Sequence, residues 1–291
     1  MQPNPPQSQS ADPAGDACPA GGHLRRVDAV RFDSGGGRPE SQAVCEESPC
    51  EIRLNGRSQV ILMATPLQLE ELALGYCLSE GIVRGAEQVL GLRCGRAELP
   101  AVGQAHWVDV ELSPELARSA RARRLAPAAT SCGLCGLESL RDLPADLAPL
   151  AQTGPRLELA GVFRLLGGME SAQGIFARTG GTHAAALGAP GGELISAAED
   201  IGRHNALDKA LGLALRGGRP FAPAESLAVL SGRLSYEMAL KIARVGIPVV
   251  ASVSAPTGLG VSLLERLNIT LIAFCRPPRA SIFTHPERII A

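Results

Sequence analysis

The loop at residues 130–136, Thr-Ser-Cys-Gly-Leu-Cys-Gly, contains the side chains of this protein that are best suited to chemistry. Cys132 and Cys135 are separated by two residues and each is followed by a glycine, a spacing that brings the two sulfur atoms close together. Such a pair of thiols can exchange a disulfide, carry a sulfur atom or ligate a metal ion. The spacing alone does not decide among these chemistries.

Zinc is the main alternative for these thiols, but one Cys-x-x-Cys motif supplies only two of the four ligands of a structural site. Zinc deaminases place His-x-Glu before Pro-Cys-x-x-Cys. Here the cysteines precede both His183 and His204, and neither histidine is followed two residues later by glutamate. A thioredoxin-type role is also disfavoured, because no N-terminal βαβ unit leads into the motif. A chaperone that uses the thiols only as metal or cofactor ligands stays open.

Composition narrows the class of protein. The chain has 291 residues, 45% of them apolar but only 3% aromatic, which indicates an aliphatic core large enough for two domains. A net charge of −1 gives no general attraction to nucleic acid or anionic membranes. Eight cysteines in a chain of this length indicate reduced thiols. With no export signal and no apolar run long enough to span a bilayer, we expect a soluble cytoplasmic protein.

The chain divides into four parts by composition and pattern. Residues 1–25 are polar and rich in proline, and we expect them to be disordered. Residues 26–120 form a small α+β domain, and residues 121–155 form a linker that carries the Cys-x-x-Cys loop. Residues 156–291 form the larger domain.

Local signals place several elements of the small domain. Asn55-Gly56 favours a tight hairpin turn between strands at 50–54 and 60–63. Thr65 is expected to cap a helix with Pro66 in its first turn and Gln68 closing a capping box, and Gly81 is expected to end it. Further strands are expected around 89–92 and 106–110.

The larger domain has the pattern of a three-layer α/β/α fold with a mixed sheet. A helical stretch at about 157–178 precedes a hairpin formed by 182–187 and 193–196. A helix at 205–215 then leads into alternating strands and helices. The strands are continuously apolar, as strands covered on both faces must be; they lie at 227–230, 248–252 and 269–274, with helices at 235–245 and 259–267 between them.

Ligands of open parallel sheets bind beyond the carboxyl ends of the strands. The loops there carry guanidinium and hydroxyl groups, which suit a phosphate or pyrophosphate; they include Arg203, Arg233, Ser254, Thr257, Arg276 and Arg279. His204 could be a base, a ligand contact or a capping group. The other polar side chains of this region are expected to be structural. His183 packs in the sheet, Asp208 and Lys209 are solvated or locally paired, and Glu237 pairs with Lys241 on a helix surface.

Several ordered motifs together resemble the formate dehydrogenase accessory sulfurtransferase (FdhD) family from about residue 27 to the C-terminus. They are Leu-Glu-Glu-Leu-Ala-Leu-Gly at 69–75, Ser-Cys-Gly-Leu-Cys-Gly at 131–136, Thr-Gly-Gly-Thr-His-Ala-Ala at 179–185, Glu-Asp-Ile-Gly-Arg-His-Asn-Ala-Leu-Asp-Lys at 199–209, Ser-Gly-Arg at 231–233, Ser-Ala-Pro-Thr at 254–257 and Phe-Thr-His at 283–285. The resemblance implies a two-domain protein, usually dimeric, whose larger domain has a cytidine-deaminase-like fold without deaminase chemistry.

The resemblance also implies a function. Such proteins take persulfide sulfur from a cysteine desulfurase on the Cys-x-x-Cys loop. They pass it to the molybdenum bis-guanine-dinucleotide cofactor before that cofactor enters formate dehydrogenase. We expect Cys132 to carry the persulfide with Cys135 assisting, and we expect no resident metal. GDP should bind as a surrogate for the cofactor, without hydrolysis, because the chain has no P-loop lysine motif.

The family's Phe-x-Arg-Gly-x-Arg segment, which binds the cofactor, maps onto Phe274, Cys275, Arg276, Pro277, Pro278 and Arg279. Proline replaces the glycine here, which removes a backbone donor and fixes φ. We expect the arginines of this segment, with Arg203 and Arg233, to contact the pyrophosphate. Ser254 and Thr257 are expected to supply hydroxyl contacts, and His204 to lie beside the ligand.

Overall fold

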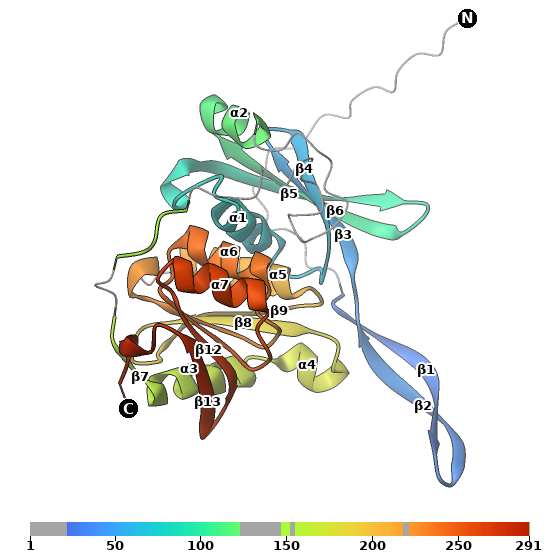
Figure 1. Cartoon of the computed structure of the whole chain (residues 1–291). Helices are drawn as coiled ribbons and strands as arrows, with labels where there is room; N and C mark the ends of the chain where they lie inside the picture. The colour runs from blue at the N-terminus through green and yellow to red at the C-terminus, as the bar shows by residue number, and fades with distance from the viewer. Residues whose placement is uncertain (1–21, 123–146, 152–154, 218–220, 291) are drawn as a thin grey trace, which may run out of the picture.

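A computed structural model describes residues 22–122, 147–151, 155–217 and 221–290 (Figure 1). The predicted persulfide residues Cys132 and Cys135 lie outside this part of the chain. No helix among the described residues is long and apolar enough to cross a membrane.

The first sheet has four strands in the order β4-β3-β6-β5. Its strands are β3 (Ser48–Leu54), β4 (Arg57–Ala64), β5 (Val89–Leu99) and β6 (Gly103–Leu112). The predicted hairpin between β3 and β4 is confirmed: Leu54 pairs with Arg57, and Asn55 and Gly56 have φ angles of 50° and 75°. The strands predicted around 89–92 and 106–110 are also confirmed.

Helix α1 (Leu69–Ser79) begins later than the sequence predicts. Its N-cap is Gln68, which has a left-handed backbone, and Thr65 caps nothing. The prediction is wrong because Thr65 is held by distant residues: its N–H donates to Asp200 Oδ2 (3.0 Å) and its carbonyl accepts from Lys209 Nζ (2.9 Å). The helix ends as predicted, just before Gly81 (φ 69°).

The second sheet has six strands in the order β13-β12-β11-β10-β8-β9. Strands β10 (Leu227–Leu230), β11 (Val249–Ser252) and β12 (Thr270–Arg276) are parallel. The pair β8 (His183–Gly188) and β9 (Leu194–Asp200) is the predicted antiparallel hairpin. Strand β13 (Arg279–Thr284) was not predicted and extends the opposite edge. The prediction of a mixed sheet is confirmed.

Helices cover both faces of this sheet. Helices α5 (Arg203–Arg216), α6 (Tyr236–Val245) and α7 (Gly258–Arg266) pack on one face, and α3 (Leu159–Ser171) packs on the other. The predicted helix at 157–178 is therefore divided: α3 is preceded by the short strand β7 (Leu157–Glu158), which pairs with β14 (Ile289–Ile290), and is followed by α4 (Gly174–Thr179). The arrangement is a three-layer α/β/α sandwich.

One hydrophobic core joins the two sheets. It runs from the inner face of the four-stranded sheet through α1 to α5, α6 and the six-stranded sheet. Helices α1 and α5 cross where Gly75 and Gly212 face the partner backbone: a Cβ at Gly75 would lie 1.7 Å from the Asp208 carbonyl oxygen. The predicted boundary at residue 120 falls inside α2 (Pro114–Ala122), where Ala120 is buried.

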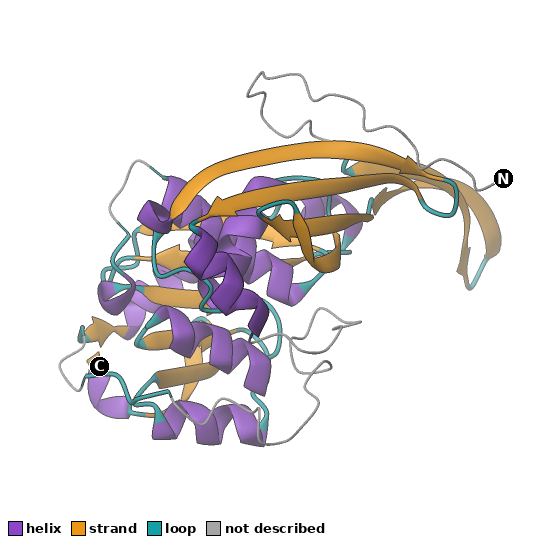
Figure 2. Ribbon diagram, turned by 90° about the horizontal axis from the view of Figure 1, so that it is seen from above, coloured by secondary structure: helices purple, strands orange, loops and turns teal. Residues whose placement is uncertain are grey.

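A two-stranded ribbon, β1 (Leu24–Asp33) with β2 (Gly36–Cys45), projects from this body (Figure 1). Seen from above, it extends well beyond the helices (Figure 2). None of the sequence signals described above predicts this ribbon, and the prediction of disorder is wrong for residues 24 and 25, because they pair with the end of β2.

Candidate functional site

A pocket of about 480 Å³ opens at the carboxyl edge of the six-stranded sheet. Ser231 and Val253 follow strands β10 and β11 at this edge, and His183 begins the antiparallel strand β8 beside them. Phe176 of α4 and Ile201 after β9 also line it, and the rest of the lining is Met169, Glu170, Gln173, Gly180, Gly181 and Thr182. The pocket therefore lies where ligands of open α/β sheets bind.

Two guanidinium groups lie close to His183 at this pocket. Burial lowers the pKa of His183, and the nearby charges of Arg203 and Arg233 lower it further. Gly232 permits the close approach, because a Cβ there would lie 3.2 Å from His183 Nδ1 and 3.4 Å from Arg203 Cβ. Arg203 Nε is buried without a hydrogen-bond partner in the described part of the chain. Positive charge from two arginines beside this histidine suits an anionic ligand.

Of the two predicted hydroxyl contacts, Ser254 and Thr257, the second has a structural partner: Thr257 Oγ1 caps α7 by accepting from the Gly260 N–H (3.2 Å). The nearby Ser231 Oγ accepts a hydrogen bond from the Ala184 N–H (2.8 Å). The Ser254 carbonyl accepts from the Phe274 N–H (3.2 Å), which joins the loop after β11 to the end of β12. The contact of these residues with a ligand stays a prediction.

The predicted cofactor segment forms the end of the β12–β13 hairpin. Arg276 pairs with Arg279 across the hairpin, and a cis peptide joins Pro277 to Pro278 between them. The two arginines and both prolines are exposed. Two cations therefore lie next to each other just beyond the carboxyl end of β12.

Phe274 and Cys275, which precede this turn, point in different directions. Phe274 is 50% exposed with φ 50°, a backbone conformation unusual for a bulky residue, and its ring centroid lies 6.1 Å from that of Phe283. Cys275 is fully buried in the core beside α3, and burial raises the pKa of its thiol to about 11. The Cys275 side chain is therefore turned away from the ligand edge.

His204 lies in the first turn of α5 and is 5% exposed. Burial lowers its pKa to about 3, helped by the charges of Lys241 and Arg203, so the imidazole is neutral at physiological pH. Its Nε2 lies 3.2 Å from Glu237 Oε2. The predicted surface pair of Glu237 with Lys241 is wrong, because α6 presents Glu237 to His204 and buries Lys241.

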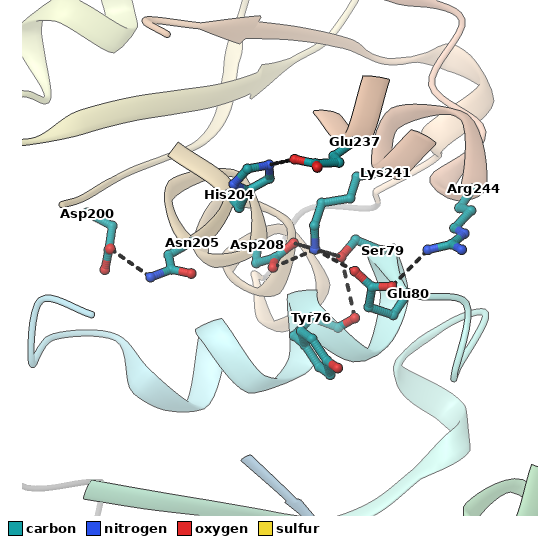
Figure 3. Close-up of polar contacts among 10 residues, drawn as sticks. All are labelled: Tyr76, Ser79, Glu80, Asp200, His204, Asn205, Asp208, Glu237, Lys241 and Arg244. Carbon is teal, nitrogen blue, oxygen red and sulfur yellow. Dashed lines mark hydrogen bonds and ion pairs between the residues drawn. The ribbon is translucent and has the colours of Figure 1, made fainter. Parts of the chain in front are cut away.

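Lys241 is the centre of a buried charge cluster between α1, α5 and α6 (Figure 3). Its Nζ donates to Asp208 Oδ2 (2.8 Å) and Ser79 Oγ (2.7 Å) and lies 3.1 Å from Glu80 Oε1. Despite burial, the two carboxylates raise the pKa of Lys241. Arg244 adds a second cation 2.8 Å from Glu80.

A second buried cluster holds the start of α5 against the first sheet. Lys209, which is completely buried, lies 2.6 Å from Asp200 Oδ2. Asn205 Nδ2 donates to Asp200 Oδ1 (2.9 Å) and to the Met63 carbonyl (2.8 Å). The prediction that Asp208 and Lys209 are solvated or locally paired is wrong, because both are buried and their partners lie on other elements. These two clusters fix the helix that carries Arg203.

Sequence reasoning missed both clusters, although one signal was available. Only two of the 28 basic residues are lysines, and both belong to these clusters. Burial raises the pKa of three described thiols, to about 12 for Cys77, to about 11 for Cys275, and also for Cys45, so none of these three is activated. The described residues contain no group of three His, Cys, Asp or Glu side chains that could hold a metal ion.

Comparison with known proteins agrees with this architecture. The FdhD/NarQ family model matches residues 45–290. The chain is 41% identical over 252 residues to proteins named "Sulfur carrier protein FdhD" from Bordetella bronchiseptica and Bordetella parapertussis, covering 87% of this chain and 89% of each relative. It also matches the crystal structure of a proposed formate dehydrogenase accessory protein from Desulfotalea psychrophila, with a TM-score of 0.68 and 28% identity over 92% of this chain and 99% of that one. The chain therefore belongs to the FdhD/NarQ family.

Proposed function

We propose that this protein is a sulfur carrier that supplies sulfur for the molybdenum bis-guanine-dinucleotide cofactor of formate dehydrogenase. The observation that carries the proposal is the 41% identity, over most of both chains, to proteins named as sulfur carriers. The sequence adds a paired-thiol loop of the kind that carries sulfane sulfur. A cysteine desulfurase is the donor, and the protein works in the cytoplasm as a homodimer.

The sulfur step needs no external oxidant. The Cys132 thiolate attacks the terminal sulfur of the donor's cysteine persulfide. The sulfur–sulfur bond of the donor breaks, its cysteine leaves as a thiolate, and Cys132 now carries the persulfide. Cys135 assists by stabilising the Cys132 thiolate, as the second thiol of such a motif does.

Mass spectrometry after incubation with a desulfurase and cysteine tests this step. We expect one added sulfur on the loop, lost in Cys132→Ala, whereas Cys45→Ala, a matched control outside the loop, should still be loaded. A protein without added sulfur on either loop cysteine would contradict the proposal. Stoichiometric zinc bound through both thiols would instead favour the chaperone that uses them only as ligands.

The cofactor site proposed here is the carboxyl edge of the six-stranded sheet. The pocket beside His183 supports it, because the charges of Arg203 and Arg233 act on that histidine, although Glu170 also lines the pocket and the buried Asp200 acts in the opposite direction. Arg276 and Arg279 present two further exposed cations at the next loop of the same edge. Pyrophosphate is the ligand chemistry that such an array of guanidinium groups binds best.

Calorimetric titration with GDP and ATP tests the site. GDP should bind more tightly than ATP if the guanine base is recognised, and Arg276→Ala should weaken GDP binding by about tenfold to a hundredfold, the effect of one charge-assisted contact. Arg57→Ala, on the distant strand β4, is the matched control and should leave the affinity unchanged. Equal affinity for GDP and ATP, or a GDP affinity of Arg276→Ala equal to that of the wild type, would refute the site.

A further inference from the structure

The arm formed by β1 and β2 is an isolated two-stranded ribbon. Its strands pair without a register shift from Leu24 opposite Cys45 to Asp33 opposite Gly36, so each extends roughly 33 Å. Most of its side chains are exposed, including Val30 (57%) and Phe32 (77%) near the tip. An isolated two-stranded hairpin is at best marginally stable in water. The arm therefore lacks the packing that would hold it in place.

The two edges of the arm differ in their ability to pair with another strand. Pro39 lies on β2 and has no N–H, so a strand added along that edge would lose a hydrogen bond. The base of β2 also contacts α4. Strand β1 has no proline, and seven of its ten residues are exposed; only at its base does Leu24 line a pocket with Ile175 and Arg178 of α4. The edge open to a partner is β1.

We propose that β1 pairs antiparallel with β1 of a second copy of this chain, giving a four-stranded sheet across a two-fold axis. Residues directly opposite each other in an antiparallel ladder must both point their hydrogen-bonding groups toward the partner or both away. Because the two strands are identical, only registers centred on a single residue satisfy this rule. The residue on the two-fold axis of this pairing must therefore lie near the middle of β1.

Charge selects one of these centres. A register centred on Asp28 would oppose Asp28 to its own copy and Arg25 to Arg31, which is unfavourable for both pairs. A register centred on Ala29 would oppose Arg25 to Asp33. Those two charges are already paired within the chain, with Glu46 and Arg38. A register centred on Val30 would place Asp28 against Phe32.

The register centred on Val27 is complementary. It opposes Arg26 of each copy to Asp28 of the other and Leu24 to Val30, with Val27 meeting its own copy on the axis. Among the described residues Arg26 donates to Ser41 alone, at 3.2 Å to Oγ and 3.0 Å to the carbonyl. Asp28 has no ion-pair partner in the described part of the chain. The pairing thus joins two opposite charges that the single chain leaves unmatched.

This interface has a structural link to the ligand edge. The base of β2 contacts α4, and Phe176 of α4 lines the pocket beside His183. A dimer formed through the arms would hold α4 in place. The arm precedes residues 45–290, so it lies before the part of the chain that the family model matches.

A pair of proline variants tests the open edge. Asp28 and Ser41 are opposite each other, and Pro39 two residues before Ser41 shows that the N–H groups of this set point away from the hairpin. Asp28→Pro therefore removes a donor from the β1 edge, whereas Ser41→Pro makes the matched change on the β2 edge. Light scattering after size exclusion should give twice 30.2 kDa for the wild type and for Ser41→Pro, and 30.2 kDa for Asp28→Pro.

A charge exchange tests the register. Arg26→Asp alone should weaken the dimer by about tenfold or more, because it opposes like charges twice, and adding Asp28→Arg should restore it. Thermal unfolding checks that each variant is folded. A wild type that stays monomeric at micromolar concentration, dissociation by Ser41→Pro as well as Asp28→Pro, or no recovery in the double variant would overturn the proposal.

Discussion

Lys241→Met tests how the buried charge cluster stabilises the fold. Methionine has a similar length and no charge, so the variant removes the ammonium with little change in volume. Arg244 still compensates Glu80 at 2.8 Å, but the Asp208 side chain, only 2% exposed, loses its cation. Removing one partner of a buried ion pair costs about 3–5 kcal/mol. A typical domain has about 5–15 kcal/mol of stability, so the variant should be severely destabilised.

A double-mutant cycle separates the charge effect from packing. Asp208→Asn in the Lys241→Met background removes the uncompensated charge, and the amide can still accept from Ser79 Oγ, which donates to Asp208 at 2.7 Å in the wild type. The double variant should therefore be more stable than Lys241→Met alone. Urea unfolding of the wild type, Lys241→Met, Asp208→Asn and the double variant at neutral pH, followed by circular dichroism, gives the four free energies of the cycle.

An exposed ion pair provides the control. Arg25 lies 2.7 Å from Glu46 but its side chain is 66% exposed, so Arg25→Met should cost less than about 1 kcal/mol. If Lys241→Met cost no more than this control, or if the double variant were less stable than the single one, charge compensation would not be the reason for the cluster.

Three further outcomes follow from the packing and charges described above. Gly75→Ala should lower the unfolding free energy because its Cβ would meet the Asp208 carbonyl oxygen at 1.7 Å, whereas Gly167→Ala, with open space around it, should raise it by about 0.5–1 kcal/mol. The pKa of His204 in the folded protein is about 3, below its ordinary value of about 6.5. The stability contribution of the neutral histidine is therefore complete above about pH 6.5 and falls by about 1.4 kcal/mol per pH unit as the pH drops from about 6.5 towards 3. On acidification His204→Gln should thus lose less stability than the wild type. A His204 pKa above 6.5 by NMR would show instead that Glu237 controls it. Neither lysine should react with an amine-directed reagent until urea unfolds the protein.

The larger sheet was predictable because its signals are local. The strand at 227–230 is apolar throughout, and the intervening helices have apolar residues at three- and four-residue spacing, so each element can be recognised from its own residues. The Asn55-Gly56 turn was predictable for the same reason, since its backbone conformation depends on those two residues. The ligand edge then follows from the topology.

The partners of buried polar residues were not predictable in this way. Thr65 has the local pattern of a helix cap, but Asp200, 135 residues away, takes its N–H. Glu237 and Lys241 have the spacing of a surface pair, yet the helix face that bears Lys241 is covered by α1. The arm was missed because an exposed ribbon needs no apolar alternation, and β1 has almost none.

The distribution of the basic residues relates the fold to the site. A lysine ammonium is a compact charge with three donors, and it fits a buried position between two or three acceptors; Lys241 and Lys209 occupy such positions at the two ends of the contact between α1 and α5. Arginine offers a planar group suited to phosphate, and the charges of Arg203 and Arg233 act on His183 of the pocket lining. The charges of both lysines are neutralised by buried carboxylates, and these ion pairs immobilise α5. Arg203 at the start of α5 and Arg233 after β10 remain available to bind an anionic ligand. Changing a lysine should therefore act on stability first, whereas changing one of these arginines should act on ligand affinity in a chain that remains folded.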